Sequence, residues 1–155
     1  MAKKRRIKKN TPTTESYQIE VDDWEVYYSF GLAPKRLMEG AYWEISKLIL
    51  IGKIIFPVLK KISKARIEIA AEPQMDDHWQ PEPTIKSAKA IGFMEILRGD
   101  EILIFYCSVP SRSLPYAALA VQSGKIKYVS IFGTKLKWRQ GTISSVSLST
   151  HREDE

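Results

Sequence analysis

Apolar and polar residues alternate along most of this chain. From Tyr17 to Phe30 the apolar positions recur at every second residue, with a change of phase at Asp22 and Asp23. A period of two is typical of a strand with one buried face. The segment therefore predicts one strand, or a hairpin that turns at the aspartate pair.

The β pattern continues through the first half of the chain. Residues 41–56 are dense in β-branched and aromatic side chains, and Gly52 with Lys53 marks a turn or bulge between two short strands. Residues 65–71 alternate again and predict a further strand. Residues 72–84 contain three prolines and show no apolar period, so we expect a long surface loop between two β-rich halves.

The second half begins with a hairpin. Strand-like runs at 86–97 and 101–109 are joined by Arg-Gly-Asp at 98–100, a composition that favours a tight turn. Residues 113–124 begin with serine and an early proline, continue with helix formers and end with glycine, which predicts a short helix.

Three alternating runs at 125–132, 135–140 and 142–150 then predict a β-meander. Together the segments give eight or nine short strands and one helix. We expect an all-β, mostly antiparallel sandwich or barrel. The alternative is an α+β fold with a helix packed on a sheet.

The net charge of +6 comes from one short segment. Residues 1–10 contain six cations and no acid, and the rest of the chain contains 18 of each sign. So many like charges repel one another and cannot form a core. We predict a disordered basic tail at 1–16, a single β-rich domain at 17–150 and a polar acidic end at 151–155. Within that domain, residues 102–150 hold six cations and no acid.

Cysteine content and hydropathy suggest where the protein resides. Cys107 is the only cysteine, so an intramolecular disulfide is impossible and a reducing compartment is natural. The basic segment is followed by polar residues, without the apolar stretch of a secretory signal. Residues 48–59 are the most apolar segment, but they are too few to span a bilayer. We expect a cytoplasmic protein without a membrane span.

Few side chains offer catalytic chemistry near neutral pH. The candidates are His78, His151 and Cys107. Asp76, Asp77 and His78 are weak candidates for a metal site or a general base, but adjacent loop residues seldom converge on one point, so a solvated acidic loop is favoured. Cys107 lies in an apolar strand and is expected to be a buried hydrophobic residue. We therefore predict a protein that is not an enzyme and has no cofactor.

Two groups of cations are candidate polyanion-binding residues. The tail contributes Lys3, Lys4, Arg5, Arg6, Lys8 and Lys9, and the meander contributes Lys125, Lys127, Lys135, Lys137 and Arg139. Period two would place the meander cations on one face, with Tyr128 and Trp138 pointing inward. If the first two meander strands pair around Gly133 and Thr134, the five cations form one compact patch.

Each group also has an interpretation without a ligand. A charged terminus can simply raise solubility, and exposed lysines on strands prevent edge-to-edge aggregation. Our functional hypothesis is a non-enzymatic adaptor whose tail, with or without the basic meander, attaches to nucleic acid or another polyanion. The alternative is a protein-interaction or self-assembly β-sandwich module with no nucleic-acid role, since strand edges invite strand addition. A protein partner or a homo-oligomer is open in both cases.

Overall fold

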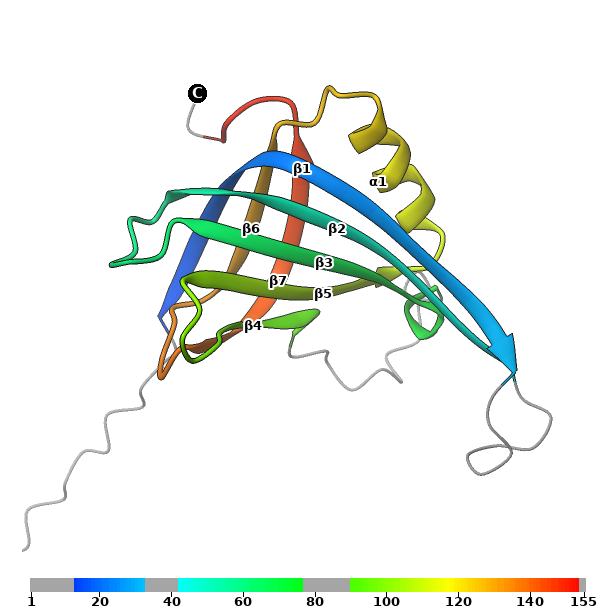
Figure 1. Cartoon of the computed structure of the whole chain (residues 1–155), viewed down its shortest axis with the longest axis horizontal. Coiled ribbons are helices and arrows are strands. Elements are labelled where there is room, and N and C mark those ends of the chain that lie inside the picture. The colour runs from blue at the N-terminus through cyan, green and yellow to red at the C-terminus, as the bar shows by residue number, and fades with distance from the viewer. Residues whose placement is uncertain (1–12, 33–41, 77–89, 154–155) are drawn as a thin grey trace, which may run out of the picture.

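A single sheet closes into a barrel in the computed structural model, which describes residues 13–32, 42–76 and 90–153 (Figure 1). The strand order around the barrel is β1-β2-β3-β5-β4-β7-β6, and the last strand pairs with β1. The strands are β1 (Thr14–Leu32), β2 (Tyr42–Phe56), β3 (Lys64–Glu72), β4 (Gly92–Ile96), β5 (Ile102–Pro110), β6 (Tyr128–Thr134) and β7 (Gln140–Ser149).

The all-β prediction is confirmed, with seven described strands in place of eight or nine. Every neighbouring pair is antiparallel except β3 with β5, which run parallel. The described helical elements are α1 (Ser113–Gln122) and the 3-10 turn η1 (Pro73–Met75). No helix in the described ranges has both the length and the apolar character needed to cross a membrane.

The first two strands are longer than the sequence predicts. β1 is one strand that starts at Thr14, inside the range expected for the tail, and it bulges at Asp22 instead of turning. β2 likewise runs through Gly52 and Lys53 as one strand, so these residues do not separate two short strands, and the bulge lies in β1 opposite Gly52. Gly52 is required for a packing reason, because a Cβ at this position would collide with the carbonyl oxygen of Glu20 on β1. The glycine allows a close strand approach beside the bulge.

The predicted hairpin and helix are both present. β4 and β5 pair antiparallel around a turn that contains Gly99 at a φ of 83°. α1 forms where the sequence predicts it, although Arg112, not Ser113, occupies the N-cap position and makes no side-chain capping bond. β4 begins at Gly92, and the expected strand residues 86–89 lie outside the described ranges.

The predicted three-stranded meander is wrong. Only two strands form, β6 and β7, and residues 135–139 connect them. Lys137 and Gln140 exchange backbone hydrogen bonds of 2.8 and 3.1 Å, while Trp138 and Arg139 between them have φ values of 53° and 66°. Two central residues with positive φ define a type I′ hairpin turn. The alternating pattern therefore continued through a turn, which the period alone did not reveal.

The barrel interior is filled by apolar side chains from the strands. Tyr17 and Phe105 meet edge to face, with ring centroids 5.6 Å apart, among fully buried aliphatic residues. α1 packs against β2, β3 and β5 and contributes Leu114 and Val121 to the same core. The helix thus covers apolar residues at one end of the barrel.

The direction of each strand determines at which of the two barrel ends a connection lies. One end receives the start of β1, the β2–β3 loop, the β4–β5 turn and the β6–β7 turn. It lies toward the lower left in Figure 1. The other end receives α1 and the end of β7. Each of these connections therefore has a fixed place relative to the start of β1.

β1 and β2 extend past the barrel as a two-stranded arm, here defined as residues 24–32 and 42–46 (Figure 1, lower right). β6 pairs only with residues 14–20 of β1, and β3 pairs only with residues 47–53 of β2. The arm therefore has no third strand in the described part of the chain.

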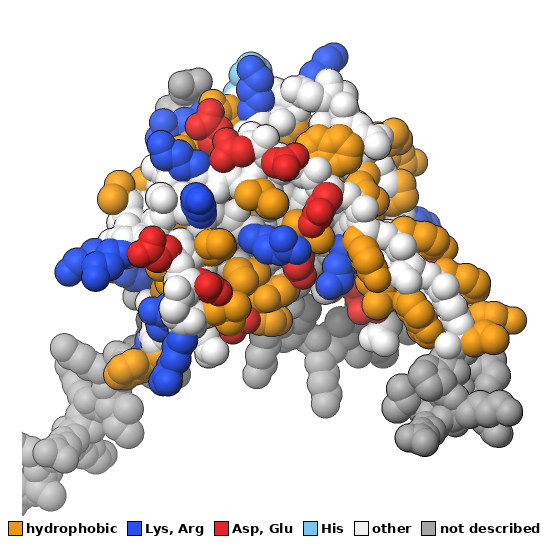
Figure 2. Space-filling view, in the orientation of Figure 1, with side chains coloured by type: hydrophobic (Ala, Val, Ile, Leu, Met, Phe, Trp, Pro, Cys, Tyr) orange, Lys and Arg blue, Asp and Glu red, His pale blue; other side chains and the backbone are white. Residues whose placement is uncertain are grey.

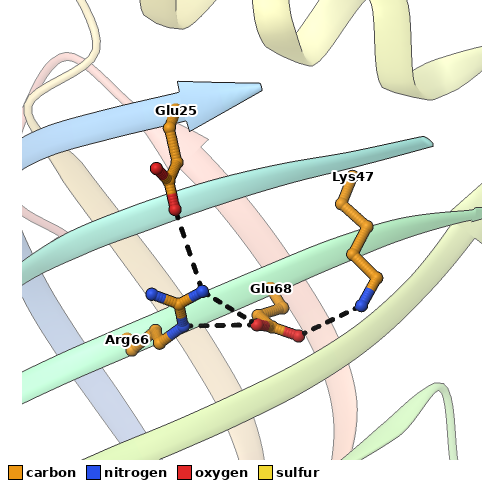
Figure 3. A network of polar contacts seen from close by, with 4 residues as sticks. All are labelled: Glu25, Lys47, Arg66 and Glu68. Atoms are coloured by element: carbon orange, nitrogen blue, oxygen red, sulfur yellow. Dashed lines mark hydrogen bonds and ion pairs between the residues drawn. The ribbon is translucent and has the colours of Figure 1, made fainter. Parts of the chain in front are cut away.

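A network of charges crosses three strands at the base of the arm (Figure 3). The Arg66 guanidinium on β3 donates to Glu68 at 3.1 and 3.2 Å and lies 3.8 Å from the Glu25 carboxylate on β1. Lys47 on β2 reaches the other oxygen of Glu68 at 3.5 Å. Opposite charges on adjacent strands favour this register.

Candidate nucleic-acid interface

Cations are concentrated in the loops at the barrel end where β1 starts. We call this region the basic end and define it by the β2–β3 loop, the β4–β5 turn and the β6–β7 turn. Its cations are Lys60, Lys61, Arg98, Lys135, Lys137 and Arg139, all exposed. The same connections hold two carboxylates, Asp100 and Glu101. Lys and Arg side chains are prominent there in Figure 2. An excess of cations on one end favours polyanions.

In the part of the chain that the structure describes, no basic-end cation forms an ion pair with a carboxylate. Ion pairs join Lys47 and Arg66 to Glu25 and Glu68. That network lies on the barrel wall and includes no basic-end cation. The lysine charges at this end are therefore available to an external anion.

Trp138 is the most exposed aromatic residue described, at 88%. The prediction that it points inward is wrong, because the I′ turn carries it away from the barrel. It stands between Lys137 and Arg139 at the basic end. An outward aromatic ring flanked by cations is the combination on which bases of single-stranded nucleic acid stack.

The turn that presents Trp138 has an unfavourable local conformation. Positive φ is uncommon for residues other than glycine, asparagine and aspartate, and each such residue costs about 1–2 kcal/mol. Trp138 and Arg139 both adopt it, in a turn type that favours Asn-Gly. Strain of this kind is often found at functional sites.

Arg139 also has a structural role. Its guanidinium donates to the carbonyl oxygens of Ile96 at 2.9 Å and Leu97 at 2.6 Å. These bonds fasten the β6–β7 turn to the β4–β5 turn. Of the meander cations at this end, Lys135 and Lys137 make no such side-chain bonds, so they are the better anion-binding candidates.

The basic tail joins the barrel beside the same turn. The backbone N–H of Lys135 donates to the carbonyl of Thr13 at 2.7 Å, and Thr14 pairs with Thr134. The tail cations themselves lie outside the described residues. The described chain begins at Thr13, beside Lys135.

The five meander cations do not form one patch. β6 separates Lys125 and Lys127 from Lys135, Lys137 and Arg139, because the pairing expected around Gly133 and Thr134 does not form. A seven-residue strand spans about 20 Å. Lys125 and Lys127 therefore belong to the α1 end of the barrel. Sequence reasoning also missed Lys60, Lys61 and Arg98, which join the basic end only through strand order.

The acidic loop is only partly described. The carboxylate of Asp76 accepts hydrogen bonds from the Ser111 backbone N–H, at 2.6 Å, and from the Ser111 hydroxyl. The hydroxyl bond is the main cause that lowers the pKa of Asp76 below its ordinary value of 3.8. Asp77 and His78 lie outside the described ranges, as does Trp79. Within those ranges, no group of three or more histidine, cysteine or acidic side chains is placed to hold a metal ion.

The other two candidates for chemistry have different surroundings. Cys107 is buried in the barrel core, as predicted, and burial raises the pKa of its thiol to about 12. A thiol held neutral is a poor nucleophile. His151 is exposed just beyond β7, and its backbone carbonyl accepts a hydrogen bond from the Ser149 hydroxyl at 2.6 Å.

Comparison with known proteins adds no family to this description. No protein-family model, curated protein or solved structure matches this chain. The function is therefore inferred from the chain's own residues.

Proposed function

We propose that this protein binds nucleic acid at the basic end of its barrel, with the N-terminal tail as a second electrostatic contact and without a catalytic step. The observation that carries the proposal is the 88% exposed ring of Trp138 between two cations, next to the residue from which the tail leaves the barrel. Charge alone would suit any polyanion. An outward aromatic ring adds an affinity for bases, which other polyanions lack.

Single-stranded nucleic acid is the ligand that these features support best. Its bases are free to stack on Trp138, whereas those of a duplex are already paired. The tail can contact phosphates that lie beyond the barrel. Lysine–phosphate contacts make binding depend on salt, and log K falls by about 0.7 per phosphate contact and per decade of salt concentration. The guanidinium of Arg139 in this turn already donates to the backbone carbonyls of Ile96 and Leu97, so it is not free to read a base sequence, and binding is expected to tolerate sequence changes.

The decisive experiment is fluorescence polarisation of a labelled single-stranded oligonucleotide with the full chain at several salt concentrations. Trp138→Ala should weaken binding by about 1–3 kcal/mol, the usual value of one base–aromatic stack. The double variant Lys135→Gln/Lys137→Gln should reduce the salt slope by about 1.4, since two phosphate contacts are lost.

The chain offers a matched control. Lys125→Gln/Lys127→Gln removes the same charge from the opposite end of β6 and should leave affinity and salt slope unchanged. Equal losses in the two double variants would mean that only net charge matters. Unaltered affinity in Trp138→Ala would show that bases do not stack on Trp138. Heparin is a polyanion without bases, so it should bind the wild-type protein and Trp138→Ala equally.

A further inference from the structure

The arm exposes a concentration of large apolar side chains unlike any other described segment. Nine of them lie in its two strands at exposed fractions of 37–68%: Trp24, Val26, Tyr27, Tyr28, Phe30, Leu32, Tyr42, Trp43 and Ile45. Figure 2 shows apolar side chains along its length at the lower right. The acidic residues in the arm are Glu25 and Glu44, and it contains no cation. Such a surface is costly for a monomer in water.

Six of these side chains share one face. In β1 the alternate residues Trp24 and Val26 pair with Leu50 and Leu48, which are fully buried in the barrel core. This inner face of the arm is therefore the continuation of the barrel lining beyond the point where other strands cover it. Its apolar residues are Trp24, Val26, Tyr28, Phe30, Leu32 and Tyr42, and the register places Ser46 and Glu44 on the same face.

The inner face is ordered by contacts within the arm. The rings of Phe30 and Tyr42 stack with centroids 5.5 Å apart and an interplanar angle of 11°. On the outer face, the Trp43 indole N–H donates to the carbonyl of Leu32 at 3.1 Å. A face preorganised in this way loses little side-chain entropy when it is covered.

The area of the face fits a second copy of the chain. At these exposed fractions each large side chain leaves on the order of 100 Å² in water, so the six leave about 600 Å². Two such faces in contact would bury about 1,200 Å², the lower limit of a stable interface. A two-fold axis brings identical surfaces together without leaving any part of the patch uncovered.

We propose that the protein forms a symmetric dimer in which the inner faces of the two arms pack against each other. Two-stranded ribbons in face-to-face contact lie about 10 Å apart, with interdigitated side chains. Glu44 pairs with Phe30 and is exposed on this same face, so each arm brings one carboxylate to the contact. The basic end is at the opposite end of the barrel, so the interface leaves it open.

Sedimentation velocity of the full chain over a range of concentrations tests this proposal. The wild-type protein should pass from the 17.8 kDa monomer to twice that mass as its concentration rises. Phe30→Lys and Tyr42→Lys, one on each strand of the arm, should each stay monomeric throughout. The far-UV circular dichroism of both should match that of the wild type, because neither side chain belongs to the core.

Phe132→Lys is the matched control. Phe132 is 44% exposed on β6, outside the arm, and this variant should dimerise as the wild type does. A wild-type protein that stays monomeric at all concentrations would overturn the proposal. A dimer that persists in both arm variants, or is lost equally in Phe132→Lys, would overturn it as well. None of these results depends on nucleic acid.

Discussion

Single residues at the β6–β7 turn show how local stability and binding can oppose each other. Trp138 and Arg139 occupy backbone positions that Asn and Gly fill most easily. Arg139 recovers part of this cost by donating to two carbonyls of the neighbouring turn. Trp138 makes no comparable contact, since its ring is almost wholly in water. Its conformation is therefore not explained by stability.

This reasoning predicts that Trp138→Asn stabilises the fold. The change relieves an unfavourable φ and removes little packing, so the free energy of unfolding should rise by about 1 kcal/mol. Urea denaturation of the two proteins measures it. The same variant should bind single-stranded nucleic acid more weakly. A loss of stability would show that the ring contributes to the barrel, and the turn would then need no functional explanation.

At the scale of elements, α1 buries apolar side chains in the core, whereas the arm exposes them to water. α1 places Leu114 and Val121 in the core and leaves Tyr116 and Leu119 in water. The arm instead carries the barrel lining out beyond the core. The helix therefore covers the barrel interior, and the arm exposes apolar residues that continue the barrel lining.

The role of α1 can be tested with two leucines of the same helix. Leu114→Ala should lower the free energy of unfolding by about 3 kcal/mol, because it leaves a cavity in the barrel core. Leu119→Ala should change it by less than about 0.5 kcal/mol, because Leu119 is exposed. Thermal and urea unfolding measure both. Equal effects would mean that the helix stabilises the fold through its backbone and not through core contacts.

At the scale of the whole molecule, the basic end and the apolar arm lie at opposite ends of the barrel. The basic end gathers three loops and the root of the tail, while the arm leaves the barrel on the other side (Figures 1 and 2). An arm-to-arm dimer would carry two basic ends. The two proposals then combine in one molecule without sharing a surface.

This arrangement predicts avidity. A single strand long enough to reach both basic ends should bind the dimer at least about tenfold more tightly than a strand of half the length. Phe30→Lys should lose this preference for length while keeping its affinity for the short strand. Polarisation titrations with the two oligonucleotides measure the ratio. If Phe30→Lys still binds the long strand more tightly than the short one, the preference comes from two contacts on a single chain and not from a dimer.

The pattern of apolar positions determined much of the local structure. It gave the β class, the β4–β5 hairpin, the helix at 113–122 and the burial of Cys107. These features depend on neighbours in the chain, on period two, and on residues such as Gly99 that allow a tight turn. Charge counting likewise located the net charge in the tail.

Tertiary structure decided which distant residues meet. The parallel pairing of β3 with β5 brings the β2–β3 and β4–β5 loops to one barrel end, and closure by β1 and β6 adds Thr13 and Lys135. Alternation could not show that Trp138 lies in a turn, because a turn can continue a period of two. Alternation also could not show that β1 and β2 extend beyond β6 and β3, the strands that pair with them. Strand pairing sets both features, and it is a property of the closed sheet, not of any one segment.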